Sequence, residues 1–148
     1  MKTSFFILLI SVLGCSTHDF PGDPVKTTLI AKDILYGNGE EEIPEQNLVI
    51  RDSESWNELI KKMNSVNQVS DSFTQTDIDF TKFTVLAVFD KVENSGGYDI
   101  TIEKVFDKDK ALVVKIRKIS PAGFVTQVMT QPFHIIKIPA TQKQVIFE

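Results

Sequence analysis

Residues 52–63 have the sequence DSESWNELIKKM, and this stretch does most to decide the fold class. Four of its apolar side chains recur at intervals of three and four residues: Trp56, Leu59, Ile60 and Met63. This is the spacing of one face of an amphipathic helix, and Asp52 and Ser53 before it offer an N-cap. The stretch therefore predicts one principal helix that is fastened to a sheet by Trp56.

Extended segments lie on both sides of this helix. We expect strands near residues 27–36, 46–51, 85–89, 98–103, 112–117, 124–130, 133–138 and 145–147. The run Val85-Leu86-Ala87-Val88-Phe89 is continuously apolar, which indicates a central strand buried on both faces. Short turns join the later strands, and strands joined in this way pair antiparallel. The sequence thus predicts an α+β fold, an antiparallel β-sheet meander with one principal amphipathic helix packed on it.

The first residues indicate export. Lys2 precedes an apolar run, Phe5 to Leu13, that is too short to span a bilayer as a helix. Val12-Leu13-Gly14-Cys15 resembles the lipobox of bacterial lipoproteins, in which the cysteine receives the lipid. We therefore expect three parts: a lipoprotein signal peptide at 1–14, a lipidated Cys15 with a flexible tether at 15–26, and a single domain at 27–148.

The composition excludes several classes of protein. The chain carries 16 Lys and Arg against 20 Asp and Glu, a net charge of -4, which argues against nucleic-acid binding. Its 42% of hydrophobic residues, 11 Phe among them, exclude a disordered chain. Cys15 is the only cysteine, so the domain has no disulfide and its stability must come from packing.

The residues that most often carry catalysis do not form a recognisable set. Asp77 and Asp79 are spaced like a carboxylate pair, but beside Phe80 they are more typical of turn caps. His134 lies among apolar residues without a partner at ligand or nucleophile spacing, and His18 falls in the tether. We therefore expect no metal, no cofactor and no enzyme activity.

Several short segments, in their order and spacing, resemble the PrcB (protease complex subunit) family of bacterial proteins, over roughly Leu29 to Pro139. The segments are Ser53–Leu59, Asp79-Phe80, Ser95–Ile100 and Thr130–Lys137. Members of this family are exported and often lipid-anchored, and the member that gave the name associates with a surface serine protease and is thought to assist its assembly or stability. The resemblance implies a noncatalytic, protein-binding role.

Two turns within this segment are candidates for contact with a partner. One consists of Ser95, Gly96, Gly97 and Tyr98, and the other contains Pro121 and Gly123. Turns two hairpins apart in a meander often lie at the same end of the sheet, so we expect one rim with Tyr98 as a contact residue. The alternative is that Gly96 and Gly97 only adopt positive φ angles while Tyr98 fills the core.

The sequence therefore favours a lipid-anchored, noncatalytic envelope protein that acts as a protein-binding accessory module and assists the assembly or stability of an exported protease complex. The expected partners are another envelope or secreted protein, a protease among them, and the membrane through lipid on Cys15, at the outer membrane or cell surface. Alternatives are a protease inhibitor that presents Gly-rich loops and a small-molecule or glycan-binding lipoprotein. A hydrolase using Asp77, Asp79 and His134 is the least expected.

Overall fold

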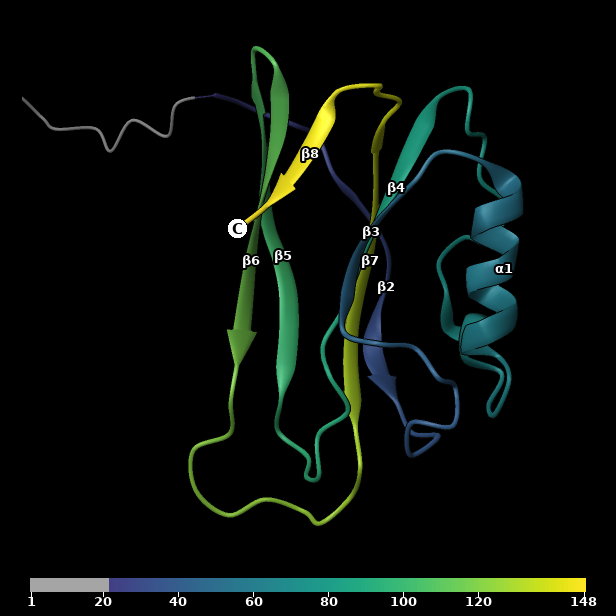
Figure 1. Ribbon diagram of the computed structural model, residues 1–148, viewed down its shortest axis with the longest axis vertical. Helices are drawn as coiled ribbons and strands as arrows, with labels where there is room; N and C mark the ends of the chain where they lie inside the picture. Colours follow the sequence, from purple (N-terminus) through teal and green to yellow (C-terminus); the bar gives the residue numbers. More distant parts are fainter. Residues whose placement is uncertain (1–21) are drawn as a thin grey trace, which may run out of the picture.

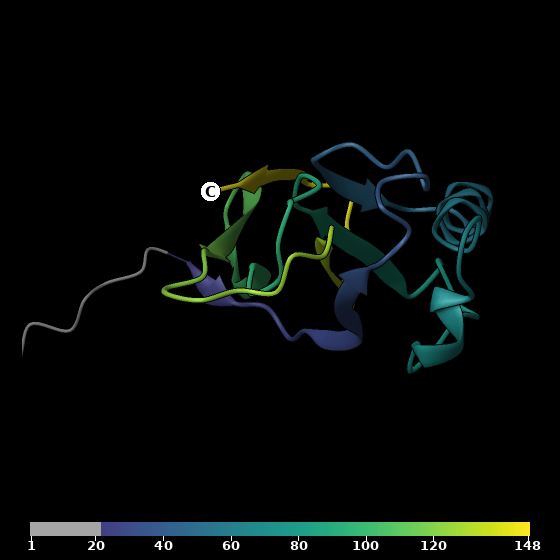
Figure 2. The ribbon, with the colours of Figure 1, turned by 90° about the horizontal axis from the view of Figure 1, so that it is seen from below.

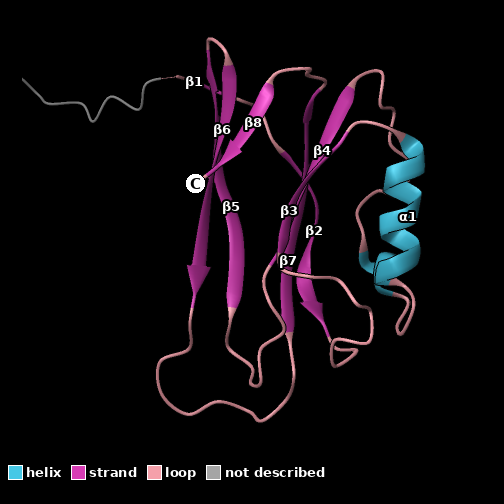
Figure 3. Cartoon of the chain, in the orientation of Figure 1, coloured by secondary structure: helices cyan, strands magenta, loops and turns pink. Residues whose placement is uncertain are grey.

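A computed structural model describes residues 22–148, which form eight strands, one α-helix and one short 3₁₀ helix (Figure 3). In chain order they are β1 (Asp23–Pro24), β2 (Thr28–Leu35), β3 (Gln46–Ile50), α1 (Ser53–Met63), η1 (Val69–Ser72), β4 (Phe83–Phe89), β5 (Asp99–Lys108), β6 (Ala111–Ile119), β7 (Gln131–Pro139) and β8 (Gln144–Phe147). The predicted α+β composition is confirmed, with predominantly antiparallel strands and one α-helix.

The strands form two four-stranded sheets that face each other. The central sheet has the order β2-β7-β4-β3, and the outer sheet has the order β1-β5-β6-β8. Helix α1 packs on the far face of the central sheet, so the molecule has three layers (Figures 1 and 2). The central sheet is therefore covered on both faces.

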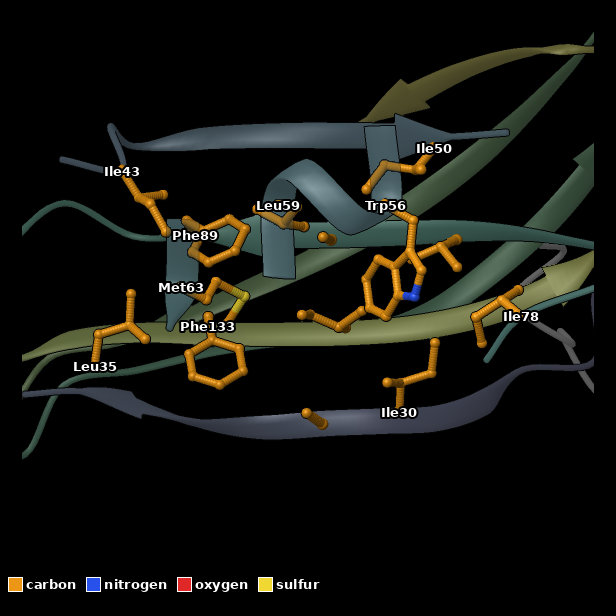
Figure 4. Close-up of a cluster of buried hydrophobic side chains, with 14 residues drawn as sticks. Ile30, Leu35, Ile43, Ile50, Trp56, Leu59, Met63, Ile78, Phe89 and Phe133 are labelled. Atoms are coloured by element: carbon orange, nitrogen blue, oxygen red, sulfur yellow. The ribbon is translucent and has the colours of Figure 1, made fainter. Parts of the chain in front are cut away.

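Strand β4 shows how the sequence supports this arrangement. Its side chains alternate between two apolar clusters, because successive residues of a strand point to opposite faces. Val85, Ala87 and Phe89 join the cluster under α1 (Figure 4). Leu86 and Val88 join the cluster between the two sheets. The continuous apolar run thus forms an interior strand buried on both faces, as predicted.

Helix α1 begins and packs where the sequence indicated. The Asp52 carboxylate accepts a hydrogen bond from the backbone N–H of Ser55 at 2.8 Å, which caps the first turn. Trp56, Leu59 and Met63 are buried against the central sheet (Figure 4). The indole Nε1 of Trp56 donates to the carbonyl oxygen of Thr76 at 2.7 Å, so its one polar atom is satisfied.

The strands do not follow a single meander. β2 pairs with β7, the strand farthest from it in the chain order of the central sheet. β8 pairs parallel with β6, although we expected only antiparallel pairs. The reason is that the short connection from β7 to β8 crosses from one sheet to the other, whereas a short turn forces antiparallel pairing only between neighbours in one sheet. Arg51 holds this connection by donating to the carbonyl oxygens of Thr141 and Lys143, both at 2.9 Å.

Two further expectations are wrong. Residues 124–130 do not form a strand, and of them only Thr130 makes a bridge, to Glu93. β-branched residues favour a strand only where a neighbouring strand supplies the ladder, and none lies beside this segment in the described chain. Asp23–Pro24, expected in the tether, instead form β1 against β5, so the folded unit begins earlier than residue 27.

Candidate functional site

The two turns predicted to share a rim lie beside each other. Strand β5 begins at Asp99 and β6 ends at Ile119, and these two residues are paired across the hairpin. Gly97 has a φ of 90°, and a Cβ placed on it would lie 2.8 Å from the Cβ of Pro121. Gly97 is therefore required both by its backbone conformation and by the close approach of the second turn.

The β6–β7 loop continues this end of the molecule and exposes apolar side chains. Phe124 is fully exposed, and four more side chains are between 37% and 40% exposed: Ile119 at the end of β6, and Val125, Val128 and Met129 in the loop. No Asp, Glu, Lys or Arg occurs from Ile119 to Phe133. We call the turn 95–98 together with residues 119–129 the rim surface; it lies at the lower end of Figure 1. Single exposed apolar side chains are common, but several within one uncharged segment are candidates for contact with a partner.

The C-terminal half of the β6–β7 loop is hydrogen-bonded to the turn at residues 95–98. The backbone N–H of Gly96 donates to the carbonyl oxygen of Thr126 at 3.0 Å, and the hydroxyl of Thr130 donates to the carbonyl oxygen of Ser95 at 2.7 Å. Glu93 and Thr130 exchange two backbone hydrogen bonds, of 2.7 and 3.0 Å. These contacts fix residues 126–130 and leave Phe124 at the projecting end of the loop.

A hollow of about 430 Å³ opens next to the rim surface. It is lined by Glu45, Asp90, Lys91, Glu93, Tyr98, Lys118, Ile119 and Ser120. Tyr98 is half-buried, so it neither projects freely nor fills the core. A second hollow, of about 470 Å³, adjoins the first and shares Glu45 and Lys118 with it.

Lys118 lies between the two hollows and links the sheets. Its ammonium group donates to the Asp90 carboxylate at 2.6 Å and also to the Glu45 carboxylate. Burial acts to lower the pKa of Lys118, but these two carboxylates hold it above its ordinary value. Lys118 therefore stays charged and neutralises a carboxylate, that of Asp90, in a residue only 4% exposed.

The Glu93 carboxylate is less well satisfied. Glu93 is 9% exposed, and its nearest cation is the Lys91 ammonium at 3.6 Å. Among the residues that the structure describes, none donates a hydrogen bond to this carboxylate. The Glu93 oxygens are not among the fully buried unpartnered atoms of the described residues, so they keep contact with water, and Glu93 is the carboxylate of the hollow that is paired at the longest distance.

The other singled-out residues lie away from the rim surface. Asp79 is exposed and accepts hydrogen bonds from Thr81, which with Lys82 lowers the pKa of Asp79 to about 2. It is a turn cap, as expected, and Asp77 makes no set with it. Within residues 22–148, no three His, Cys, Asp or Glu side chains are grouped as metal ligands would be.

His134 joins the two sheets. Its Nδ1 accepts a hydrogen bond from the backbone N–H of Ile102 at 2.8 Å, which connects β7 to β5. Burial, together with the nearby Lys32 ammonium, lowers the pKa of His134 to about 4. His134 is thus neutral near pH 7 and accepts a hydrogen bond from the outer sheet, as its apolar surroundings indicated.

Sequence reasoning missed the charged residues of the hollow. Only Lys118 could have been identified from the sequence. Leu112, Val114 and Ile116 alternate on one face of a strand, and extending this alternation by two residues places Lys118 on the same face. Glu45, Asp90 and Glu93 come from separate segments, and only the pairing of the sheets brings them together. Cys15 lies outside the described residues, as does most of the predicted tether.

Comparisons with known proteins support the predicted resemblance. Residues 84–139, from β4 to the end of β7, match the family model described as PrcB C-terminal. The matched segment includes the whole rim surface, but it leaves out the helical segment 53–59 that also suggested the resemblance. No curated protein and no solved structure matches the chain. No helix of residues 22–148 is long and apolar enough to cross a membrane.

Proposed function

Because residues 84–139 match the PrcB C-terminal family model, we propose that this protein is a noncatalytic binding module that is attached by lipid on Cys15 to the bacterial cell envelope. The family name points to a protease complex, so the partner that we propose is an exported protease or another subunit of its complex. The protein assists the assembly or stability of that complex by docking to it.

The rim surface is the observation that carries this proposal. A small domain that buries Trp56, Phe89 and Phe133 completely nevertheless leaves Phe124 fully exposed. The exposed side chains form one uncharged segment, within the part of the chain that matches the family. Exposed aromatic and apolar residues of this type form the centre of protein interfaces, where they lose their contact with water.

The position of the rim surface also suits a partner away from the anchor. The described chain begins at Gly22, against Asp107 near the β5–β6 turn. The rim surface lies at the other end of β5, a strand of ten residues, or about 30 Å. Lipid on Cys15 would therefore hold the domain by the end that is distant from the β6–β7 loop (Figure 1).

Site-specific photo-crosslinking in the bacterium that makes the protein tests the docking. A benzophenone side chain is placed at Phe124 in one strain and at Val66, which follows α1 in the chain and is 42% exposed, in a matched control strain. We expect a protein adduct at position 124 and none at position 66. Equal adducts at both positions, or none at position 124, would contradict docking through the rim surface.

The anchor is tested separately. In the Cys15→Ser variant we expect loss of radiolabelled palmitate from the protein and its movement from the membrane fraction to the soluble fraction. The unchanged fold is checked by comparing the thermal unfolding of the two purified domains. Palmitate labelling that persists in Cys15→Ser would exclude lipidation at this residue.

A further inference from the structure

We propose that the hollow lined by Tyr98 and Glu93 binds a lysine or arginine side chain of the partner, presented from an extended apolar segment that lies on the β6–β7 loop. This inference rests on the proposed protein-binding function and names the chemistry of the bound segment. It follows from the charges in the hollow, the state of Glu93 and the composition of the adjoining loop.

The charges of the hollow do not balance. Three carboxylates line it, those of Glu45, Asp90 and Glu93, against the two ammonium groups of Lys91 and Lys118. Lys118 is bonded to Glu45 and Asp90 at once. Lys91 is 64% exposed at its side chain and lies 3.6 Å from Glu93, so water screens this pair. One negative charge is thus left for a cation from outside.

Glu93 is held in place to receive such a cation. Its backbone is fixed by two hydrogen bonds to Thr130, while its carboxylate faces the hollow without a hydrogen bond from any described residue. An incoming ammonium or guanidinium group would supply the missing donors. Charge-assisted hydrogen bonds to a carboxylate whose backbone is already fixed lose less entropy on binding than those to a mobile side chain.

Tyr98 and Ile119 provide the apolar wall that a long basic side chain requires. Both line the hollow, and Ile119 is also exposed on the rim surface, so the two features are continuous. Lysine and arginine bury their methylene groups along such walls while the charged end reaches a carboxylate. The hollow, at about 430 Å³, is large enough to admit one such side chain.

The adjoining loop determines what flanks the basic residue. From Ile119 to Phe133 the chain has no charge, which leaves no group to attract charged neighbours. The backbone N–H groups of Val125 and Gln127, which lie on the same side of an extended chain, donate to no backbone carbonyl within the described chain. An extended segment satisfies them by main-chain pairing while its apolar side chains contact Phe124 and Val125.

A lipid surface fits these observations less well. An apolar loop with Phe124 at its end could insert in a bilayer, but the membranes of bacteria carry anionic lipids. The neighbouring carboxylates of Glu93 and Asp90 would oppose such a surface. We therefore favour a protein segment, and binding to vesicles is one of the outcomes that the experiment below distinguishes.

Selection from a random heptapeptide library on the purified chain is the first step of the test. We expect the selected peptides to share one lysine or arginine flanked by apolar residues. A consensus without a basic residue, or no consensus after repeated rounds, would overturn the inference. The same selection on Phe124→Ser should not yield this consensus, which shows that the peptides occupy the rim surface.

The affinities of the best peptide then test the role of Glu93. Replacing the basic residue of the peptide by norleucine should weaken its binding to the native chain about tenfold. With Glu93→Gln the same replacement should change the affinity less than about twofold, since the charge that it pairs with is gone. Glu58→Gln, on the exposed face of α1, is the matched control and should behave as the native chain does.

The remaining outcomes separate this inference from the proposed function. If Glu93→Gln keeps the full tenfold effect, the basic side chain binds elsewhere and the inference is wrong. If the chain binds vesicles of phosphatidylglycerol but no peptide, the rim surface is a membrane contact. If a protein is crosslinked at position 124 while the peptides show no basic preference, the docking stands and the inference about Glu93 fails. Thermal unfolding of Glu93→Gln shows whether the variant is folded.

Discussion

Two apolar regions of this protein, the cluster under α1 and the β6–β7 loop, differ in how well they are shielded from water. Under α1, the ring of Phe73 contacts both Trp56 and Phe133, with ring centroids 6.2 and 6.3 Å apart respectively. In the β6–β7 loop, Phe124 is fully exposed to water and Val128 is 38% exposed. Both regions are rich in apolar residues, so composition does not explain the difference. The helix covers one region, and we propose that a partner covers the other.

The largest expected effect separates these two regions by their contribution to stability. Trp56→Ala should lower the free energy of unfolding by about 3–5 kcal/mol, because it empties a fully packed site under α1. Phe124→Ala should change it by less than about 0.5 kcal/mol, because Phe124 is already exposed. Urea denaturation of the three chains measures both. A large loss in Phe124→Ala would mean that the loop is packed in solution.

Acidification should weaken the junction between the two sheets. The pKa of His134 is lowered in the folded state to about 4 from its ordinary 6.5, so the unfolded chain binds the proton more tightly. The stability that neutral His134 contributes to the folded state is fully present above pH 6.5 and is lost as the pH falls to 4, a loss of about 3 kcal/mol. His134→Gln removes the titrating group, so its stability should fall less over this range. The free energy of unfolding of the two chains is measured by urea denaturation at several pH values. An equal fall for both chains between pH 6.5 and 4 would contradict this account of His134.

Two glycines of the rim surface should differ in sensitivity. Gly97→Ala should destabilise the domain by about 2 kcal/mol, because its φ is 90° and the new Cβ would meet Pro121. Gly123→Ala should cost about 1 kcal/mol, because its φ is 102° but no atom lies within 4 Å of the new Cβ. Thermal unfolding compares the variants. If the two costs were equal, the close approach of the two turns would be absent in solution.

The smallest expected effect concerns the start of the helix. Asp52→Ala should cost about 1 kcal/mol, because it removes the acceptor for the N–H of Ser55. Asp71→Ala, in the 3₁₀ helix η1, should be within about 0.5 kcal/mol of the native chain, because no side chain caps that helix. Urea denaturation again provides the comparison. A loss as large in Asp71→Ala would show that the cap does not set the stability of α1.

The sequence predicted the features that depend on local pattern. The spacing from Trp56 to Met63 determined the helix, and the run from Val85 to Phe89 determined the doubly buried strand. It failed where pairing over long distances decides. The parallel β6–β8 pair and the absence of a ladder at residues 124–130 depend on which strands become neighbours. No local pattern contains that information.

The same division applies to the candidate site. The two turns were predicted to share a rim, and Gly97 lies against Pro121 as a result of the β5–β6 pairing. The hollow could not be predicted, because Glu45, Asp90 and Glu93 approach Lys118 only after the two sheets face each other. The exposure of Phe124 could not be predicted either, because an apolar residue in a predicted strand is expected to be buried.

The affinity of the partner crosslinked at position 124 tests the central claim most directly. With that partner purified, its dissociation constant is measured for the native chain, Phe124→Ser and Val66→Ser. We predict that Phe124→Ser weakens binding at least about tenfold and that Val66→Ser leaves it unchanged, because a central aromatic residue dominates an interface. Binding that is equally strong to all three chains would contradict the claim that the rim surface is the docking surface.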